Sequence, residues 1–335
     1  MNEVVKIQQV NELVLHIKVG NVAAAMIRNT CASSIAASKE SRLAMLHFLQ
    51  LLVNKFRANA EETSEGRTPL DKIMADLVTG SLNATDATAQ NIIQTLAYLT
   101  ASALSANSRF ATKLITLMLG IVTGSSLRLG SSAAKGFRII LAPSDILNKE
   151  NFCQIWNMRE SKLFNMVFTP LRTAWSTGNA TIKANCLAAL AGVIGHMDAL
   201  NYAYTDFAPF LLPLVLEGME LQGDDWAKIT YVKIAKQLIL LRTDLVMEHL
   251  RTVIHRLTNR THNDLFSPSD SSVECRVLAL EALQSIIQTF SPTAVLKERR
   301  HIDYELKVAS DDASPDVRDA ARKCSLALLY VKDEA

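Results

Sequence analysis

The chain contains little glycine and little proline, with 12 glycines and 8 prolines among 335 residues. Both residue types interrupt regular secondary structure, so their scarcity leaves long windows in which leucine, alanine and polar helix formers dominate. No run alternates valine, isoleucine, threonine and tyrosine in the manner of a β-strand. The sequence therefore predicts an all-α protein, and its length exceeds that of one ordinary compact core.

Long hydrophobic runs and an excess of one charge are also missing. The longest apolar windows, Leu114–Val122 and Phe207–Leu216, are far shorter than the ~18–20 residues that cross a bilayer. Polar residues such as Glu3 and Lys6 interrupt any signal-peptide core near the N-terminus. The 35 basic and 33 acidic residues give a formal net charge of +2, which provides no large electrostatic footprint for nucleic acid. We therefore expect neither a membrane partner nor direct binding of nucleic acid.

Motifs for catalysis and cofactor binding are missing as well. The chain has no glycine-rich phosphate or dinucleotide loop, no Gly-x-Ser-x-Gly and no His-Glu-x-x-His. Its five cysteines are scattered, whereas zinc and iron–sulfur sites need clustered thiolates. Cys186, Cys275 and Cys324 fall at or near small positions of a repeating frame, where a buried thiol packs like alanine. We predict a protein that is not an enzyme, has no metal or other cofactor, and acts inside the cell.

Two stretches near the C-terminus share one design, 42 residues apart. Asp270–Arg276 and Asp312–Arg318 each open with an aspartate, pass through a polar turn and reach an arginine six positions later. Each is followed three residues on by an alanine, Ala279 or Ala321. The separation lies within the period of about 40–47 residues that is typical of HEAT and armadillo repeats. Upstream the frame recurs with decreasing fidelity around Lys228, Lys183 and Arg128.

An amphipathic stretch precedes most of the framed segments, as expected if each repeat contains two helices. These stretches are Pro69–Leu82, Ser108–Val122, Lys162–Trp175, Asp206–Leu221, Asp244–Thr258 and Pro292–Ala309. We predict a HEAT/armadillo-type α-solenoid of about seven helix pairs, forming a single array over residues 1–335. A subdivision into 1–141 and 161–335, around an inserted loop at 142–160, is also possible. Such arrays provide extended surface and usually hold other proteins.

The aspartate and arginine of the frame suggest a structural ladder formed by Asp270, Arg276, Asp312 and Arg318. Each aspartate lies in the turn before a second helix, where its carboxylate can accept free backbone N–H groups. Each arginine lies one turn inside that helix and can reach the turn carboxylate of a neighbouring repeat. The alternative is a set of unrelated surface charges, which contribute about 0–1 kcal/mol each.

The inserted segment at 142–160 mixes turn residues with large apolar side chains. A long loop inside a compact array is often functional, and Lys149, Trp156 and Arg159 are our candidate partner-binding residues here. The alternative is that its aromatic residues cover a groove between the third and fourth repeats.

The last helix offers a second candidate surface. Val317, Ala320, Ala321, Cys324 and Leu328 recur at helical spacing and predict its buried stripe. This stripe leaves four charged residues pointing outward: Asp316, Asp319, Arg322 and Lys323. Because an end repeat has one neighbour, its other flank is either a polar cap or a docking face.

Several segments resemble one family in order along nearly the whole chain. They are Leu43–Phe56, Arg138–Ile155, Ser161–Leu171, Ile182–Ile194, Leu211–Glu217, His249–Leu257 and the closing repeat around Asp311 and Arg318. The chain resembles the C-terminal region of the large HEAT-repeat adaptor of the cytosolic iron–sulfur assembly targeting complex. That family is also described as a methyl-methanesulfonate-sensitivity, nucleotide-excision-repair and transcription scaffold. The sequence of these segments most resembles the fungal branch of the family.

The resemblance implies a non-enzymatic adaptor of the cytoplasm and nucleus. Its expected partners are subunits of the iron–sulfur targeting complex and apo-clients that act in DNA repair, replication and transcription. The chain departs from the family in the last turn, where Ser314–Asp316 replaces a usual Lys-Arg pair, so the partner surface there is altered. The alternative is a HEAT module of another kind, such as a transport receptor or a nuclear scaffold.

Overall fold

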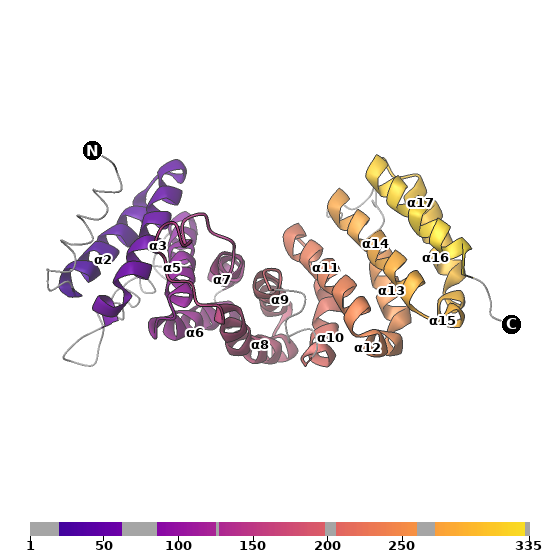
Figure 1. Ribbon diagram of the computed structural model, residues 1–335, viewed down its shortest axis with the longest axis horizontal. Coiled ribbons are helices and arrows are strands. Elements are labelled where there is room, and N and C mark those ends of the chain that lie inside the picture. The colour runs from indigo at the N-terminus through magenta and orange to yellow at the C-terminus, as the bar shows by residue number, and fades with distance from the viewer. Residues whose placement is uncertain (1–19, 62–85, 125–126, 198–205, 260–271, 332–335) are drawn as a thin grey trace. The chain divides into compact units, whose positions relative to one another are not determined.

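The computed structural model describes residues 20–61, 86–124, 127–197, 206–259 and 272–331 (Figure 1). Within these ranges every regular element is an α-helix, so the predicted all-α class is confirmed. Contacts divide the chain into two compact units, Met1–Pro170 and Leu171–Ala335. The boundary falls inside α8 (Arg159–Thr177) at Pro170, downstream of the inserted segment.

The first unit is built from helix pairs. Its described helices before α8 are α2 (Gly20–Ala36), α3 (Lys39–Glu61), α5 (Asp86–Ser105), α6 (Phe110–Thr123) and α7 (Leu127–Ile140). α2 packs against α3 and α6 against α7, while α3, α5 and α7 contact one another in sequence. The helix predicted at Pro69–Leu82 lies outside the described residues.

The second unit continues the same pattern. Its helices after α8 are α9 (Ala180–Ile194), α10 (Ala208–Gly218), α11 (Asp225–Leu241), α12 (Thr243–Glu248), α13 (Leu250–Thr258), α14 (Val273–Thr289), α15 (Pro292–Lys297), α16 (Arg299–Ser310) and α17 (Pro315–Leu329). α9, α11, α14 and α17 contact one another in succession and form a layer of second helices. α10, α13 and α16 each pack against the second helix that follows. This is the helix-pair arrangement of a HEAT/armadillo-type array.

The sequence explains where the second helices begin. Asn179 precedes α9, and its side chain accepts the Ile182 N–H at 3.0 Å. Asp224 caps α11 through the Ala227 N–H at 3.1 Å, and Ser272 caps α14 through the Cys275 N–H at 3.3 Å. These caps satisfy backbone donors that have no partner inside the helix.

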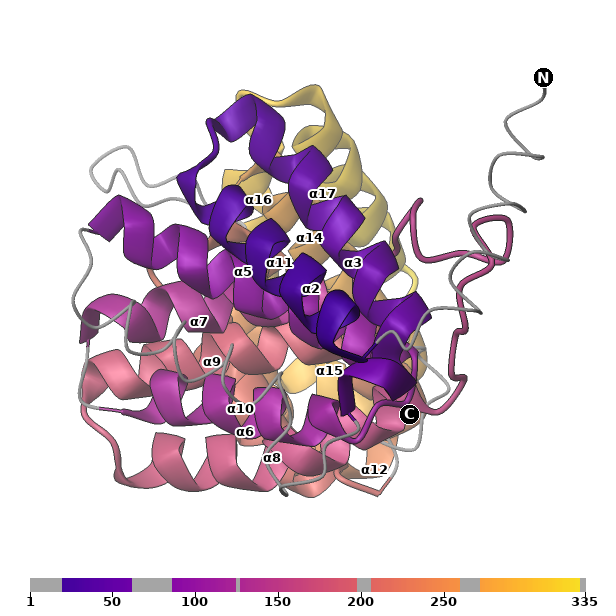
Figure 2. The ribbon, with the colours of Figure 1, turned by 90° about the vertical axis from the view of Figure 1, so that its left-hand side faces the viewer.

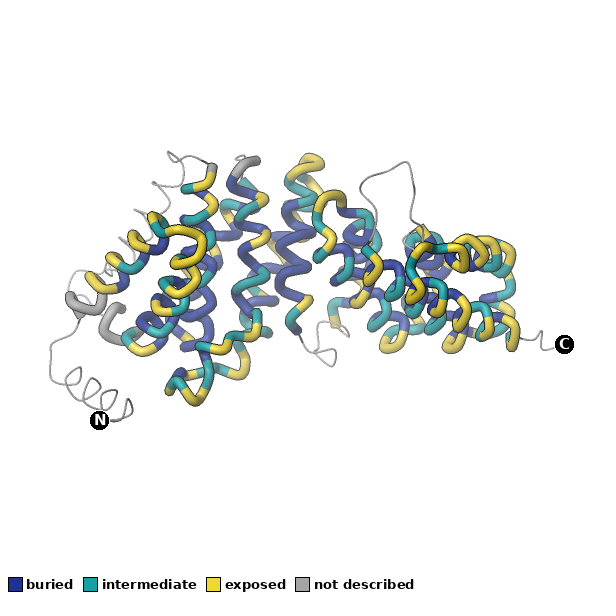
Figure 3. Tube along the Cα trace, turned by 90° about the horizontal axis from the view of Figure 1, so that it is seen from above, coloured by how far each residue is buried: buried dark blue, intermediate teal, exposed yellow. Residues whose placement is uncertain are grey.

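Apolar residues at helical spacing form the core of each unit. The five residues predicted as the buried stripe of α17 are all buried. Figure 3 shows buried residues running through the middle of the helices, with exposed residues gathering at their ends and outer turns.

Two first helices are divided, although the sequence pattern predicted one helix in each place. α12 and α13 are separated at His249 (φ −115°, ψ 13°), and α15 and α16 at Glu298 (φ −99°, ψ 3°). Neither break contains proline or glycine, so local propensity does not explain it.

The second-helix frame has a large residue, Tyr231, at a position where most repeats have a small one. Its ring is fully buried, and Gly218 of α10 supplies the missing space. The Tyr231 hydroxyl donates to the Leu187 carbonyl of α9 at 2.7 Å. The extra volume is therefore accommodated by a glycine on one neighbouring helix, and the polar tip is bonded to another.

Candidate protein-interaction surfaces

A buried ion pair joins the last two repeats. The Arg276 guanidinium in α14 binds Asp312, with Nε 2.9 Å from Oδ2 and Nη2 3.1 Å from Oδ1. Their side chains are 7% and 3% exposed, so the pair lies inside the array. The Nη2–Oδ1 contact is a charge-assisted hydrogen bond, whereas Nε is close to Oδ2 without hydrogen-bond geometry. Arg276 thus connects a second helix to the turn of the next repeat.

The other members of the frame act more locally. Asp312 also accepts the Ser314 N–H at 2.8 Å, next to the start of α17. Arg318 donates to the backbone carbonyls of Asp312 and Ala313, at 2.7 and 2.9 Å, and so holds its own turn. Asp270 lies outside the described residues. Lys228, the corresponding basic residue of α11, is fully buried and lies 3.6 Å from Asp225.

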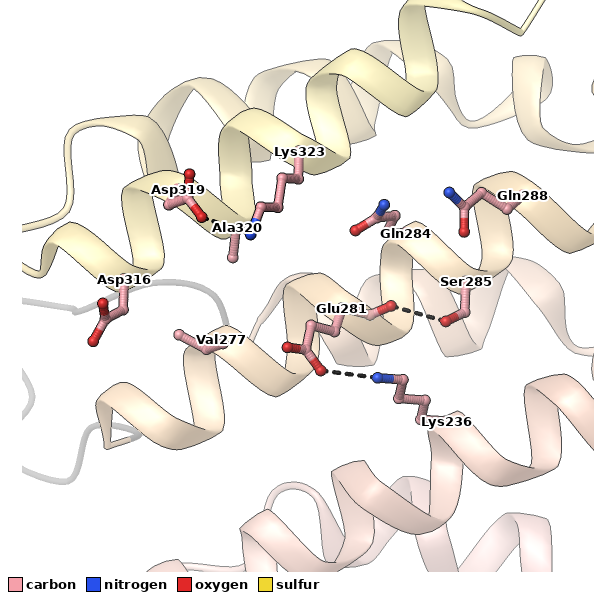
Figure 4. A pocket seen from close by; sticks show the side chains of 10 residues that line it. All are labelled: Lys236, Val277, Glu281, Gln284, Ser285, Gln288, Asp316, Asp319, Ala320 and Lys323. Atoms are coloured by element: carbon pink, nitrogen blue, oxygen red, sulfur yellow. Dashed lines mark hydrogen bonds and ion pairs between the residues drawn. The ribbon is translucent and has the colours of Figure 1, made fainter.

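A polar groove of about 530 Å³ lies along α14 and α17 (Figure 4). Asp316, Asp319 and Lys323 of α17 line it, so three of the four outward-pointing residues predicted for this helix share one surface. Across from them, α14 contributes Glu281 and Gln284. The groove therefore lies on the layer of second helices.

Ion pairs occupy most of the charges in the groove. Lys236 of α11 binds Glu281 at 2.8 Å, and Lys323 binds Asp319 at 2.7 Å. The hydrogen bond from Lys323 lowers the pKa of the Asp319 carboxyl, and the same bond raises the pKa of Lys323. Both residues are exposed, so this pair tunes surface charge and contributes little to stability.

Arg322 does not line the groove, and its side chain is 80% exposed. Its Nη1 lies 4.0 Å from Oδ1 of Asp319, so Arg322 flanks the groove at the carboxylate that also binds Lys323. Leu326 and Leu329 follow at the i+4 and i+7 positions and are 52% and 69% exposed. This stripe is opposite the buried stripe of the helix, and the neighbouring Tyr330 is 74% exposed. We name Arg322, Leu326 and Leu329 the open side of α17.

Leu326 and Leu329 were not predicted from the sequence to be surface residues. The sequence did contain this information, because the five residues predicted as the buried stripe of α17 do not include Leu326 or Leu329. Two exposed leucines at helical spacing give this side of α17 an apolar character that a purely polar cap would not have.

The inserted segment is firmly attached to the first unit, beside whose helices Figure 2 shows it as an irregular run. The Asn54 side chain of α3 binds the backbone of Gln154 twice, donating to its carbonyl and accepting its N–H, both at 3.0 Å. The Trp156 N–H donates to the Ser105 carbonyl at 2.8 Å, and Arg159 Nη1 donates to the Ser105 hydroxyl at 3.1 Å. The anchors of the segment therefore lie on α3 and α5.

The three candidate residues of this segment have different surroundings. Arg159 donates its hydrogen bond to Ser105. The Trp156 ring is half-buried, and the Lys162 ammonium lies 5.3 Å from its centre. Lys149 is exposed, as is Phe152, whose ring side chain is 71% exposed. Phe152 also has a backbone φ of 54°, a left-handed conformation that is unusual for a large side chain. These candidates belong to the first unit and those of α17 to the second.

The cysteines are all buried free thiols. Burial raises the pKa of Cys31, Cys186 and Cys324 to about 12, which keeps these thiols neutral. Among the residues that the structure describes, no three His, Cys, Asp or Glu side chains gather in a way that could hold a metal ion. The described helices also include none with the length and hydropathy needed to cross a membrane.

The helix-pair arrangement agrees with the protein family that the sequence matches. Residues 12–287 match the family described as RNAPII transcription regulator C-terminal (MMS19_C). The chain belongs to this family. The matched region of the MMS19 C-terminal family ends within α14, so the final helix pair lies beyond it.

Comparison with solved structures finds other repeat arrays. A designed armadillo repeat protein is 14% identical, with a TM-score of 0.49 over 76% of this chain and 98% of that chain. A HEAT-like repeat protein from the archaeon Thermococcus onnurineus is 12% identical, with a TM-score of 0.40 over 86% of this chain and 97% of that chain. A search of the curated proteins finds no match to this sequence.

Proposed function

We propose that this chain is a non-enzymatic adaptor that docks components of cytosolic iron–sulfur cluster delivery to apo-client proteins. Membership of the MMS19 C-terminal family is the observation that carries the proposal. The clients would include proteins of DNA repair, replication and transcription, and the adaptor would act in the cytoplasm and nucleus. An array of helix pairs suits such a role because it holds partners on extended surfaces.

We place the docking of the delivery components on the open side of α17. Its two exposed leucines provide apolar area at the centre of the surface, and Arg322 provides a charge beside them. Arginine and apolar anchors of this kind dominate the energetics of protein interfaces.

A pull-down of purified iron–sulfur targeting-complex subunits with the full chain tests this proposal. We expect capture that persists in high salt, because apolar contacts are not screened as exposed charges are. Arg322→Glu and Leu329→Glu should each abolish capture while the melting temperature stays nearly unchanged. Arg251→Glu is the matched control, because this exposed arginine of α13 lies away from α17.

The opposite result identifies a different kind of module. Failure to capture any targeting-complex subunit, combined with DNA binding that weakens steeply with salt, would overturn the proposal in favour of a nuclear scaffold that contacts nucleic acid.

A further inference from the structure

The groove along α14 and α17 has side chains suited to a ligand that needs both donors and acceptors. Figure 4 shows Gln284 and Gln288 pointing from α14 toward α17. Neither amide is bonded to another group within the described part of the chain. Each amide offers an N–H₂ donor and a carbonyl acceptor, which is the pair of groups that a peptide backbone also presents.

The spacing of these amides fits an extended chain. Residues four apart on a helix are separated by about 6 Å along its axis. Two residues of an extended peptide cover about 6.6 Å, so Gln284 and Gln288 can meet backbone groups of every second residue on one edge. The groove follows α14 from Val277 to Gln288, about 16 Å, which corresponds to about five extended residues.

The lining argues against a docked helix. A helix satisfies its own backbone groups and binds a groove through an apolar face. Here the apolar lining residues are Val277 and Ala320, and the others are polar or charged. An extended segment has free N–H and C=O groups, and a polar groove can satisfy them.

The charges of the groove favour a basic ligand. Lys236 is paired with Glu281, and Lys323 with Asp319. Asp316 also lines the groove, and within the described residues it forms no ion pair. One carboxylate is therefore left over at the end of the groove where α17 begins.

We propose that the groove between α14 and α17 binds an extended segment of about five residues from a partner protein, reading its main chain through Gln284 and Gln288 and a lysine or arginine side chain through Asp316. This inference rests on the proposed scaffold function, because it assumes that the ligand is a segment of a partner protein. It uses a surface separate from the open side of α17.

Fluorescence anisotropy with the purified full chain tests the proposal. The probes are labelled, capped pentapeptide pools, with lysine, glutamate or alanine fixed at one position and mixed residues elsewhere. We expect a lysine pool to bind tighter than the matching glutamate and alanine pools. N-methylation at alternate residues of a sequence selected from that pool should abolish binding, because it removes main-chain donors.

Variants of the groove separate the two parts of the recognition. Replacing both glutamines, Gln284→Ala with Gln288→Ala, should weaken every pool by at least about tenfold, since each lost hydrogen bond costs a several-fold loss in affinity. Asp316→Lys should reverse the charge preference, so that the glutamate pool binds tighter than the lysine pool. Gln222→Ala and Glu248→Lys alter exposed residues outside the groove and should change nothing.

Three results would overturn the inference: no pool binds, an amphipathic helical peptide binds tighter than any extended pool, or the charge preference survives Asp316→Lys. Melting temperatures of the variants show whether the fold is intact. Intact capture of the targeting-complex subunits alongside absent peptide binding would refute the groove and leave the proposed adaptor function in place. Peptide binding without that capture would refute the adaptor function and leave the groove in place.

Discussion

Arg276 connects neighbouring repeats through a charge that is removed from water. Its guanidinium meets Asp312 in two contacts, and both side chains are almost completely buried. Burying two charges costs several kcal/mol, which the attraction and the added hydrogen bonds offset when the geometry is good. The pair therefore fixes the register of α14 against the following turn more than it adds net stability.

Arg276→Ala should lower the free energy of unfolding by about 3–5 kcal/mol, because it leaves the Asp312 carboxylate buried and without its cation. The double variant Arg276→Met with Asp312→Leu should recover part of this loss, because no charge is left buried while the hydrogen bond from the Ser314 N–H to Asp312 is still missing. Chemical denaturation followed by circular dichroism measures both. A small effect of Arg276→Ala, within about 1 kcal/mol, would show that the pair behaves as a surface salt bridge.

Gly218 is required by the tyrosine beside it. A Cβ at this position would lie 2.3 Å from two ring carbons of Tyr231, whose hydroxyl is held by Leu187. Gly218→Ala should therefore destabilise the protein by about 1–3 kcal/mol, since the ring has nowhere to move. Tyr231→Leu should make the second substitution nearly harmless, a coupling that a double-mutant cycle measures.

The matched control for this prediction is Gly120→Ala. Gly120 lies in α6, and apart from the helix's own backbone and adjacent residues no atom of the described residues lies within 4 Å of an added Cβ. Alanine should therefore stabilise that helix by about 0.5–1 kcal/mol. Equal effects of the two substitutions would contradict the packing argument.

At the scale of elements, the inserted segment between α7 and α8 is a structured connection. Asn148 accepts the Asn151 N–H at 2.9 Å, and Asn151 donates to the Ile146 carbonyl at 2.9 Å, so the turn is bonded internally. Together with the Asn54 clamp, these bonds hold Phe152 in its left-handed conformation. The strain of such a backbone is of order 1–3 kcal/mol. Because the Phe152 ring is exposed, it gains no free energy from burial that would offset this strain.

Phe152→Asn should raise the free energy of unfolding by about 0.5–1 kcal/mol, because asparagine tolerates this backbone conformation. Thermal and denaturant unfolding measure the change. Met158→Ala is the control, since Met158 is 61% exposed, has no positive φ and gains no capping group from alanine, and it should have almost no effect. Destabilisation by Phe152→Asn would mean that the ring makes contacts that matter more than the backbone strain.

The helix α17 combines three surfaces in one element. Its core stripe packs into the unit, Asp316 and Lys323 line the groove, and Arg322 lies with the two leucines on the open side. Arg322 and Lys323 are adjacent in sequence and both pair with Asp319, yet only Lys323 lines the groove. Single reversals of these two residues are therefore informative, whereas a double reversal would mix the two effects.

At the scale of the whole molecule, the buried thiols make stability depend on alkaline pH. The pKa of Cys31, Cys186 and Cys324 is raised by burial from the ordinary 9.0 to about 12, and burial also raises the pKa of Tyr231. A raised folded-state pKa of an acid means that the folded protein keeps the proton longer than the unfolded chain. The associated stability is therefore complete below pH 9 and is lost as the pH rises toward 12.

We expect the denaturant midpoint to fall steadily between pH 9 and pH 11. A variant with Cys31, Cys186 and Cys324 replaced by alanine should show a shallower fall over the same range. At pH 8 a thiol reagent should modify the native protein slowly and the denatured protein at once, because all five thiols are buried. Fast modification of the native protein would show that the thiols are accessible.

The sequence alone determined the fold class and much of the helix order. Scarce glycine and proline, helical spacing of apolar residues and a repeat of 42 residues are local properties, and they predicted the array and the buried stripe of α17. The Asp–Arg frame also predicted that Arg276 would reach a carboxylate in a neighbouring turn, and Asp312 is that residue. Ordered segment matches led to the family that residues 12–287 confirm.

The tertiary structure decided what depends on residues that are distant in sequence. Nothing local shows that Asn54 would hold Gln154, one hundred positions away, or that Gly218 would make room for Tyr231. The divisions at His249 and Glu298 follow no proline or glycine, so the sequence pattern did not predict them. The surfaces of α17 separate for the same reason: helical periodicity states which residues share a side, whereas the positions of α14 and α16 decide which side is a groove and which is open.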